Sequence, residues 1–472
     1  MSNRLTDSPV TPLSIEHILV APEVQRVECS AADYSSVARG KVVSKHDFVD
    51  QQGCRLPSVV FGLTLTGTES PEVFGRILPK SYRDVHMVPD MTTYVAPSIL
   101  GAAASVICEP SGALASPLYG SEVDASEFSA RVALRKAIKR LSSLGLTATV
   151  APELEFYLLR NEKSSPNGAS RLEAAVAKNS YACERACEAY SLERTSHFSA
   201  FFDELLRACE GARIPVTGFS HESAYSQYEV NFAPGAPLAQ ADAVFRFKRL
   251  ARQIAARQGF LASFIPKPFL AQPGCGMHWH FSLQGQDGTN AFAGIGGPSD
   301  VSKTLLHFIA GLQRDAAAAM AFFAPYDMSY DRIRRSDASP SIANWGFDDR
   351  SVAFRIPASS AKNRRVENRL PGGDASPYLT VAATLGLGTL GIEESLPCGE
   401  AGGGGGWTDS KRLPRSMTEA VSLLDESIRM RQLFGDPLVD LYCAIKRKES
   451  EERNATSEAR NQWDMVHLLE QA

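Results

Sequence analysis

Residues 274–283 constrain the fold more than any other stretch, because polar and apolar residues alternate from Met277 onward. In a β-strand, successive side chains point to opposite faces of the sheet. One face then carries His278, His280 and Ser282, and the other carries Met277, Trp279 and Phe281. Gly274 and Gly276, just before the strand, let the backbone come close to a ligand. The alternative is a core strand with two incidental histidines. Residues elsewhere in the chain decide between a ligand-binding strand and a core strand.

Two acidic pairs lie on other apolar, strand-like segments. Glu153 and Glu155 interrupt one face of the strand expected at 150–159, and Glu222 and Glu229 flank a second such segment. Neighbouring carboxylates on one face repel each other unless a cation or a proton lies between them. Exposed surface glutamates are the alternative for any one of these residues. Four of them on apolar strands favour a cation site.

Basic residues gather in the last third of the chain. Residues 362–371 alternate in charge, so that Arg365, Glu367 and Arg369 share one face of an extended segment. A solvated charged face is the usual explanation of such a run. Guanidinium groups next to carboxylates and histidines also suit the binding of phosphate and carboxylate groups.

Length and composition narrow the class of protein. A chain of 472 residues predicts two domains. The net charge of -4, without a long basic run, disfavours partners such as nucleic acid or an anionic membrane. The first residues lack a signal peptide, and no apolar run approaches the ~20 residues that a membrane span needs. With nine scattered cysteines, we expect reduced thiols and a cytoplasmic location.

The order of local patterns predicts a small sheet-rich domain followed by a larger one. Strands are expected at 41–43, 58–65, 84–90 and 104–108, and a turn-rich run at 109–117 marks the domain's end. Apolar residues at helical spacing predict a helix over 126–144, ended by Gly145. Helical spacing returns from 416 to about 444.

With these segments assembled, the sequence resembles the glutamine synthetase superfamily, closest in pattern to the γ-glutamylpolyamine synthetases and γ-glutamyl-amine ligases. The segments that carry the resemblance occur in the family's order: 152–156, 222–229, 266–268 with 274–283, 344–357 and 364–379. The resemblance implies an α+β fold, with a β-grasp domain at 17–113 and a catalytic domain at 114–472. In that second domain a curved antiparallel sheet with flanking helices forms half of a funnel. It also implies a homo-oligomer of two stacked hexameric rings, a dodecamer, with active sites between neighbouring subunits.

The resemblance also assigns roles to individual residues. One divalent metal falls on Glu155, Glu222 and Glu229, and a second on Glu153, His278 and Glu367. This oxygen-rich set suits Mg²⁺ or Mn²⁺ better than zinc. Glutamate binding falls on Gly274, His278, Arg332 and Arg369, and contacts to ATP fall on His280, Ser282, Arg350, Arg355, Lys362 and Arg365. The catalytic arginines are Arg332, Arg350 and Arg369.

The implied enzyme is an ATP-dependent carbon–nitrogen ligase whose partners are glutamate, ATP and an amine. The γ-carboxylate of glutamate attacks the γ-phosphate of ATP and forms γ-glutamyl phosphate, and a nitrogen nucleophile then displaces phosphate and leaves an amide.

Three departures from the glutamine-forming pattern concern the substrates. Pro273 replaces an asparagine before the glycine that contacts glutamate, Ala338 replaces a flap glutamate that takes a proton from ammonium, and Gly62 falls where an aspartate helps to bind ammonium. The sequence therefore favours an amine with carbon substituents, a polyamine or a monoamine, over ammonia. A glutamine synthetase in which Asp337 replaces the flap carboxylate, or a catalytically silent scaffold, are the alternatives.

Overall fold

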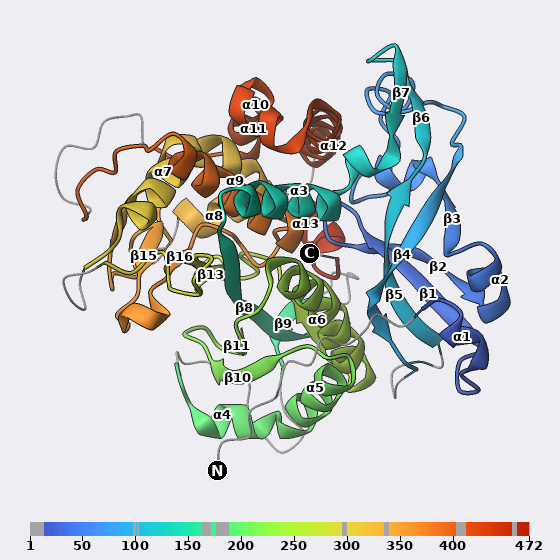
Figure 1. Ribbon diagram of the computed structural model, residues 1–472. Coiled ribbons are helices and arrows are strands. Elements are labelled where there is room, and N and C mark those ends of the chain that lie inside the picture. Colours follow the sequence, from blue (N-terminus) through green and yellow to red (C-terminus); the bar gives the residue numbers. More distant parts are fainter. Residues whose placement is uncertain are drawn as a thin grey trace.

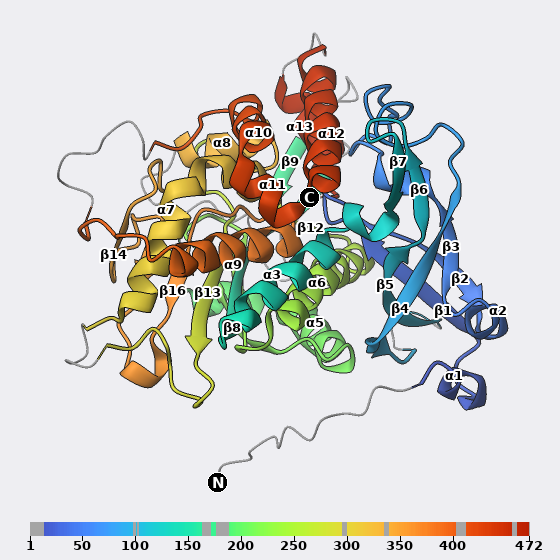
Figure 2. The same ribbon diagram turned by 45° about the horizontal axis from the view of Figure 1, so that its top comes forward.

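The computed structural model describes residues 14–97, 101, 103–162, 171–175, 188–294, 300–334, 339–402, 412–455 and 460–471. Within these residues, the N-terminal part forms a five-stranded sheet in the order β2-β1-β5-β4-β3, with β1 and β5 parallel and the other pairs antiparallel. Its strands are β1 (Arg26–Ala32), β2 (Ala38–Ser44), β3 (Cys54–Pro57), β4 (Asp84–Val95) and β5 (Ala103–Ser111). A hairpin of β6 (Ala113–Ser116) and β7 (Ser121–Asp124) lies beside this sheet in both views (Figures 1 and 2).

Two expectations for this region are wrong. The strand expected at 58–65 is instead a 3₁₀ helix, Ser58–Phe61, followed by turns. Its apolar residues follow Pro57, which has no N–H to continue the ladder between β3 and β4. The turn-rich run at 109–117 is also mostly extended, because β5 continues to Ser111 and β6 begins at Ala113.

The larger sheet carries the residues predicted to be functional. Its main path runs β10-β11-β8-β13-β16-β15-β14, with β9 and β12 paired to β8, and every pair except the parallel β14–β15 is antiparallel. The strands are β8 (Thr147–Glu162), β9 (Arg171–Ala174), β10 (Val216–His221), β11 (Gln227–Phe232), β12 (Leu261–Ser263), β13 (Met277–Gln284), β14 (Trp345–Phe347), β15 (Phe354–Ile356) and β16 (Val366–Asn368). The α+β class and the mostly antiparallel sheet agree with the fold that the resemblance implied.

Helices flank this sheet and separate it from the N-terminal sheet (Figures 1 and 2). They are α3 (Ala130–Ser143), α4 (Leu192–His197), α5 (Ser199–Gly211), α6 (Pro237–Arg257), α7 (Lys303–Phe323), α8 (Asp327–Arg334), α9 (Pro377–Glu393), α10 (Met417–Glu426), α11 (Ile428–Phe434), α12 (Asp436–Ala455) and α13 (Arg460–His467). Two further helices, α1 (His17–Val20) and α2 (Lys45–Asp50), lie beside the N-terminal sheet. Short 3₁₀ helices also occupy Ala125–Phe128 and Ala361–Asn363.

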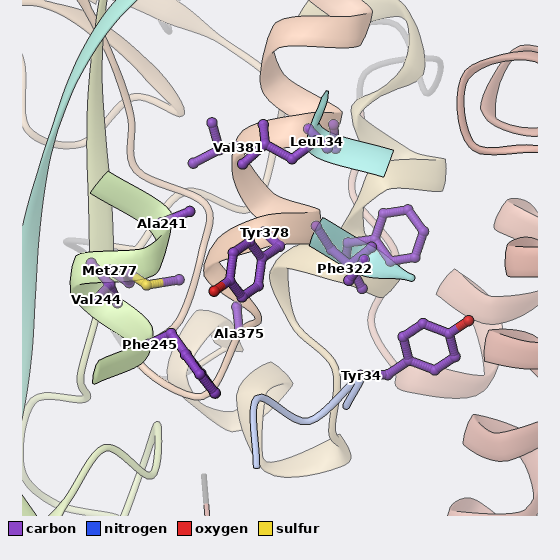
Figure 3. Packing of buried hydrophobic residues seen from close by; sticks show 14 of the residues in the cluster. Tyr34, Leu134, Ala241, Val244, Phe245, Met277, Phe322, Ala375, Tyr378 and Val381 are labelled. Carbon is purple, nitrogen blue, oxygen red and sulfur yellow. The ribbon is translucent and has the colours of Figure 1, made fainter. Parts of the chain in front are cut away.

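Helix α9 is the central helix of the core. It is apolar around its whole circumference and packs against both α3 and α7, as a helix buried on all sides must. At its start, the ring of Tyr378 packs against Phe245 of α6, with 5.9 Å between the centroids, and Met277 of β13 belongs to the same buried cluster (Figure 3). The apolar face of β13 thus packs into the helical layer, as its alternation predicted.

The predicted helices are present, with shifted boundaries. Helix α3 begins at Ala130, because Ser129 accepts a hydrogen bond from the Val132 N–H and caps it. Gly145 follows its end with a φ of +72°. The helical region expected from 416 to 444 is divided into α10, α11 and α12, with Gly435 at a φ of +81° between the last two.

The N-terminal part is joined to the C-terminal helix α12. The Leu65 N–H donates to Glu449 Oε1 at 2.7 Å, and Lys446 Nζ donates to Glu449 Oε2 at 2.8 Å. Tyr326, just before α8, donates its hydroxyl to Ser35 Oγ at 2.6 Å. The boundary predicted at residues 113 and 114 stays a proposal. None of the described helices combines the length and apolar character needed to span a bilayer.

Candidate active site

The register of the larger sheet brings predicted metal ligands onto adjacent strands. Glu229 on β11 lies directly opposite Glu155 on β8, and His278 on β13 lies directly opposite Glu153 on β8. Directly opposed residues in an antiparallel pair have side chains on the same face, within reach of each other. Glu222 directly follows the last residue of β10, the neighbour of β11. These five residues, far apart in the sequence, therefore lie on neighbouring strands of one sheet.

Glu367 of β16, the sixth predicted ligand, is fully buried and held by two guanidinium groups. Arg369 Nη1 lies 2.6 Å from Glu367 Oε1, and Arg355 Nη1 lies 3.0 Å from Glu367 Oε2. Hydrogen bonds from two guanidinium groups fix the position of this side chain. Arg355 also contacts Asp348 Oδ1 at 2.5 Å. Glu367 therefore connects the predicted metal ligands to the predicted phosphate and glutamate contacts.

The two imidazoles of β13 have partners that differ from the expected ones. His280 Nε2 lies 2.9 Å from Glu153 Oε1, and ligand atoms of Glu153, His280 and Glu367 all lie within 4.8 Å of one another. His278 Nδ1 lies 3.7 Å from Glu367 Oε1, and its Nε2 lies 3.4 Å from Arg332 Nη2. The resemblance placed His278 in the metal site and His280 on the nucleotide. The structure brings His280 into the three-residue group and keeps His278 beside it on the same strand face.

The chemistry of this donor set fits divalent cations. Burial, followed by the charge of Glu222, raises the pKa of Glu155 to about 7. Burial, followed by the charges of Glu153 and Glu155, raises the pKa of Glu229 to about 8. Burial, followed by nearby guanidinium groups, lowers the pKa of His278 well below its usual range, so the imidazole is neutral and keeps a lone pair. Repelling carboxylate oxygens beside a neutral imidazole suit Mg²⁺ or Mn²⁺.

Glu155 is held in place by hydrogen bonds from two directions. Its Oε2 accepts from the Gly276 N–H at 2.8 Å and from Gln227 Nε2 at 3.2 Å. Gln227 Nε2 also donates to the Gly274 carbonyl at 3.1 Å. The loop before β13 and the carboxylate on β8 are thus positioned together.

The two glycines of this loop make room for Arg332. A β-carbon at Gly274 would lie 2.9 Å from Arg332 Cγ, and one at Gly276 would lie 2.6 Å from His278 Nε2 and 2.9 Å from Arg332 Nη2. Arg332 is only 4% exposed and lies against this backbone. We predicted that these glycines allow a ligand to approach, and in the structure they allow the approach of a guanidinium predicted to hold that ligand.

The residues predicted to contact ATP fall into two groups. Arg365 lies beside the carboxylates with Arg355, and its Nε is 3.3 Å from His280 Nδ1. Arg350 and Lys362 have exposed side chains, and Ser282 donates its hydroxyl to a backbone carbonyl at 3.0 Å. The structure thus brings Arg355, Arg365 and His280 to the carboxylates, while Lys362 faces solvent and Ser282 bonds to the backbone. Arg350 is exposed, but its charge lies close enough to act on Glu153 and Glu222.

The sequence analysis did not identify two polar residues of the site, Gln227 and Asn231. Gln227 is 1% exposed and bonds to Glu155, and Asn231 Nδ2 donates to Glu229 Oε1 at 2.9 Å. Gln227, Glu229 and Asn231 are spaced two residues apart along β11. Because side chains two residues apart in a strand point to the same face, the sequence could have placed all three together.

Two of the three positions where the chain departs from the glutamine-forming pattern, Pro273 and Gly62, lie among the described residues. The carbonyl of Pro273 accepts a hydrogen bond from the Tyr157 hydroxyl at 2.5 Å. Gly62 packs so tightly that a β-carbon there would lie 2.5 Å from Val73 and 2.6 Å from Phe74. An aspartate would therefore not fit at Gly62 without displacing the core. Asp337 and Ala338 lie outside the described residues.

Comparison with known proteins agrees with this geometry. The family described as "Glutamine synthetase, catalytic domain" matches residues 127–466. The chain is 29% identical to the glutamate–isopropylamine ligase of Pseudomonas sp, with 97% of this chain and 98% of that protein covered. It is 27% identical to the γ-glutamylputrescine synthetase PuuA of Escherichia coli (strain K12), with 91% and 89% covered. A solved structure described as a novel glutamine synthase homolog is 25% identical, covers 94% of this chain and 98% of its own, and has a TM-score of 0.76.

The match covers most of the chain, and the residues that make up the carboxylate and arginine site lie within it. The family uses ATP and divalent metal ions to form carbon–nitrogen bonds. The chain belongs to the glutamine synthetase family and is an ATP-dependent carbon–nitrogen ligase.

Proposed function

We propose that the protein joins the γ-carboxylate of glutamate to an amine through γ-glutamyl phosphate. The observation that carries the proposal is the arrangement of five carboxylates and two imidazoles on neighbouring strands, bordered by Arg332, Arg355, Arg365 and Arg369. A protein without catalytic function has no physical need to keep repelling carboxylates together, which disfavours the silent scaffold.

In the first step, a γ-carboxylate oxygen of glutamate attacks the γ-phosphorus of ATP, and ADP leaves. Arg332 and Arg369 hold the carboxylates of glutamate, while Arg350, Arg355 and Arg365 stabilise negative charge on the phosphoryl group as it moves. In the second step, the amine nitrogen attacks the acyl carbon, phosphate leaves, and the nitrogen loses a proton to give the amide.

Two divalent cations per site, Mg²⁺ or Mn²⁺, complete the proposal. Glu155, Glu222 and Glu229 would hold one, and Glu153, Glu367 and an imidazole of β13 the other. Cations held there would offset negative charge on the transferring phosphoryl group. His278 is the imidazole that the resemblance assigns, and His280 lies near enough to Glu153 and Glu367 to share that role.

An amine with carbon substituents is the proposed acceptor, either a monoamine or a polyamine. Ammonium is small and cationic, and its selection calls for anionic groups that Gly62 and Ala338 do not supply. The apolar body of an alkylamine can be held by packing instead. The names of the two relatives, for isopropylamine and putrescine, support this choice.

The direct test measures phosphate release with glutamate and ATP against ammonium, ethanolamine, simple alkylamines, putrescine and spermidine. We expect the highest kcat/KM with an alkylamine or a polyamine. If ammonium gives the highest value, the protein is a glutamine synthetase in which another group, such as Asp337, replaces the flap carboxylate.

We also propose a ring oligomer, a dodecamer of two hexamers, in which a neighbouring subunit closes each site. Light scattering of the active protein tests this, and a fully active monomer at low concentration would contradict it. A silent scaffold would show no thermal shift with saturating Mn²⁺ and an ATP analogue.

A further inference from the structure

The two arginines proposed to hold glutamate lie on two different chain segments. Arg332 belongs to α8, and Arg369 directly follows β16 at the start of the segment that leads to α9. Both are almost fully buried, at 4% and 5% exposure. Their spacing therefore depends on how α8 is fixed to the segment between β16 and α9, residues 369–376.

One tie between these segments is a hydrogen bond from Ser329 to Asp374. Ser329 Oγ donates to Asp374 Oδ2 at 2.5 Å, and it accepts from the Tyr326 N–H at 3.1 Å. Ser329 and Arg332 are three residues apart, so they lie on the same side of α8. Because Ser329 and Asp374 are 1% and 0% exposed, water does not compete for this bond.

The second tie runs from Arg332 back to the same segment. Arg332 Nη1 donates to the Leu370 carbonyl at 3.1 Å, and Nη2 donates to the Arg369 carbonyl at 3.4 Å. Ser329, Arg332, residues 369–370 and Asp374 thus form a closed ring of contacts. Loss of either tie leaves α8 free to shift relative to Arg369.

Asp374 is a buried carboxyl group with little free space around it. Its Oδ1 is buried and has no hydrogen-bond partner among the described residues, and a β-carbon at Gly372 would lie 2.3 Å from that atom. On the far side, the buried Lys248 of α6 donates to the Ala375 carbonyl at 3.3 Å. Burial lowers the pKa of Lys248 to about 7, and burial raises the pKa of Asp374. A buried carboxylate with so few partners is costly, which a positioning function would explain.

We propose that Asp374 is a positioning residue for glutamate: through Ser329 it fixes α8 so that Arg332 and Arg369 keep the spacing that the two substrate carboxylates need. The proposal rests on the proposed function, because it takes glutamate as the ligand of both arginines. Asp374 itself contacts neither the predicted metal ligands nor the predicted ATP contacts among the hydrogen bonds of the described residues.

Asp374→Asn and Ser329→Ala test the proposal in the full-length assembled protein. We expect the KM for glutamate to rise about tenfold or more in each variant, because a buried hydrogen bond between α8 and the segment after β16 is lost or weakened. The KM values for ATP and the amine should stay within about twofold of wild type on the same reasoning. In the double variant the KM for glutamate should rise no further than in Asp374→Asn alone, since both residues act through one bond.

Thr389→Ala is the matched control. Thr389 is fully buried in α9 and donates its hydroxyl to the Leu385 carbonyl at 2.6 Å, away from both arginines. It should lower the melting temperature without changing the KM for glutamate. If Asp374→Asn does not assemble, Ser329→Ala, which deletes only a hydroxyl, decides the result.

The outcomes distinguish a failure of the proposed ligase function from a failure of the positioning role of Asp374. Wild-type protein that releases no phosphate with glutamate and any amine would overturn the proposed function. If wild type uses glutamate, two results would show that the positioning proposal is wrong. In the first, the variants raise the KM values for glutamate, ATP and the amine equally. In the second, they change only the melting temperature, as we expect for Thr389→Ala.

Discussion

Glu229→Gln should stabilise the protein in the absence of divalent cations, and the gain should grow with pH. Glu229 has a pKa of about 8 because of burial and the neighbouring charges of Glu153 and Glu155. A pKa raised in the folded state means that the folded state holds its proton more tightly than the unfolded state. The contribution of Glu229 to the free energy of unfolding is therefore fully present below pH 4.5 and is lost as the pH rises towards 8.

The size of the effect follows from the two pKa values. The pKa of Glu229 in the unfolded chain is taken as the ordinary value of 4.5. Each pH unit between the two pKa values lowers the free energy of unfolding by ~1.4 kcal/mol, so the decrease reaches about 4 kcal/mol at pH 7.5. Glutamine resembles the protonated acid and can still accept the hydrogen bond from Asn231. The variant should match wild type near pH 4 and exceed it by about 4 kcal/mol at pH 7.5.

Urea unfolding in EDTA between pH 4.5 and 8 measures this difference, with Glu193→Gln on the exposed surface of α4 as the control. Adding Mn²⁺ should then stabilise wild type more than Glu229→Gln, because the variant has lost a proposed metal ligand. If the wild-type and Glu229→Gln curves run parallel over this pH range, the carboxylates do not repel one another as the structure indicates.

Three further predictions concern the same site. Glu155→Ala and His278→Ala should each lower turnover about a hundredfold or more while light scattering shows an unchanged assembly, because both strands are held by their apolar faces; wild-type turnover in either would remove that residue from the metal set. Mn²⁺ binding at pH 7 should release roughly one proton per site, measured by calorimetry in buffers of different ionisation enthalpy, because Glu155 and Glu229 have pKa values of about 7 and 8; binding without proton release would contradict those values. Gly62→Asp should destabilise the protein by about 1–3 kcal/mol without creating a preference for ammonium, because the side chain would meet Val73 and Phe74; a stable, ammonium-preferring variant would show that this position faces a substrate.

The strands of the site were predictable because each carries its own periodicity. Alternation placed His278 and His280 on one face of β13, and the structure confirms it with Met277 and Trp279 fully buried on the other. The cross-strand register was not predictable, since Glu153 and His278 are opposed only through pairing of segments more than a hundred residues apart. The register alone does not give the partner of each imidazole, because His278 lies opposite Glu153 and yet it is His280 that bonds to Glu153. The Nε2 atom of His278 instead lies 3.4 Å from Arg332 Nη2.

Other predictions failed where local sequence was outweighed by distant contacts. The apolar run after Pro57 has high strand propensity, but it packs as a 3₁₀ helix and turns beside Val73 and Phe74. The contact between Ser329 and Asp374 joins residues 45 positions apart, and no short motif indicates it.

The bond between the Leu65 N–H and Glu449 joins residues 384 positions apart, which bears on how the protein folds during synthesis. The N-terminal sheet leaves the ribosome first, but the loop around Leu65 lacks its partner until α12 has been made. Contacts of such long sequence separation form late and slow folding. The apolar side chain of Leu65, which packs with Tyr326 and Trp463 in the finished protein, stays without those neighbours until then. This part of the N-terminal region therefore reaches its final packing only when synthesis is almost complete.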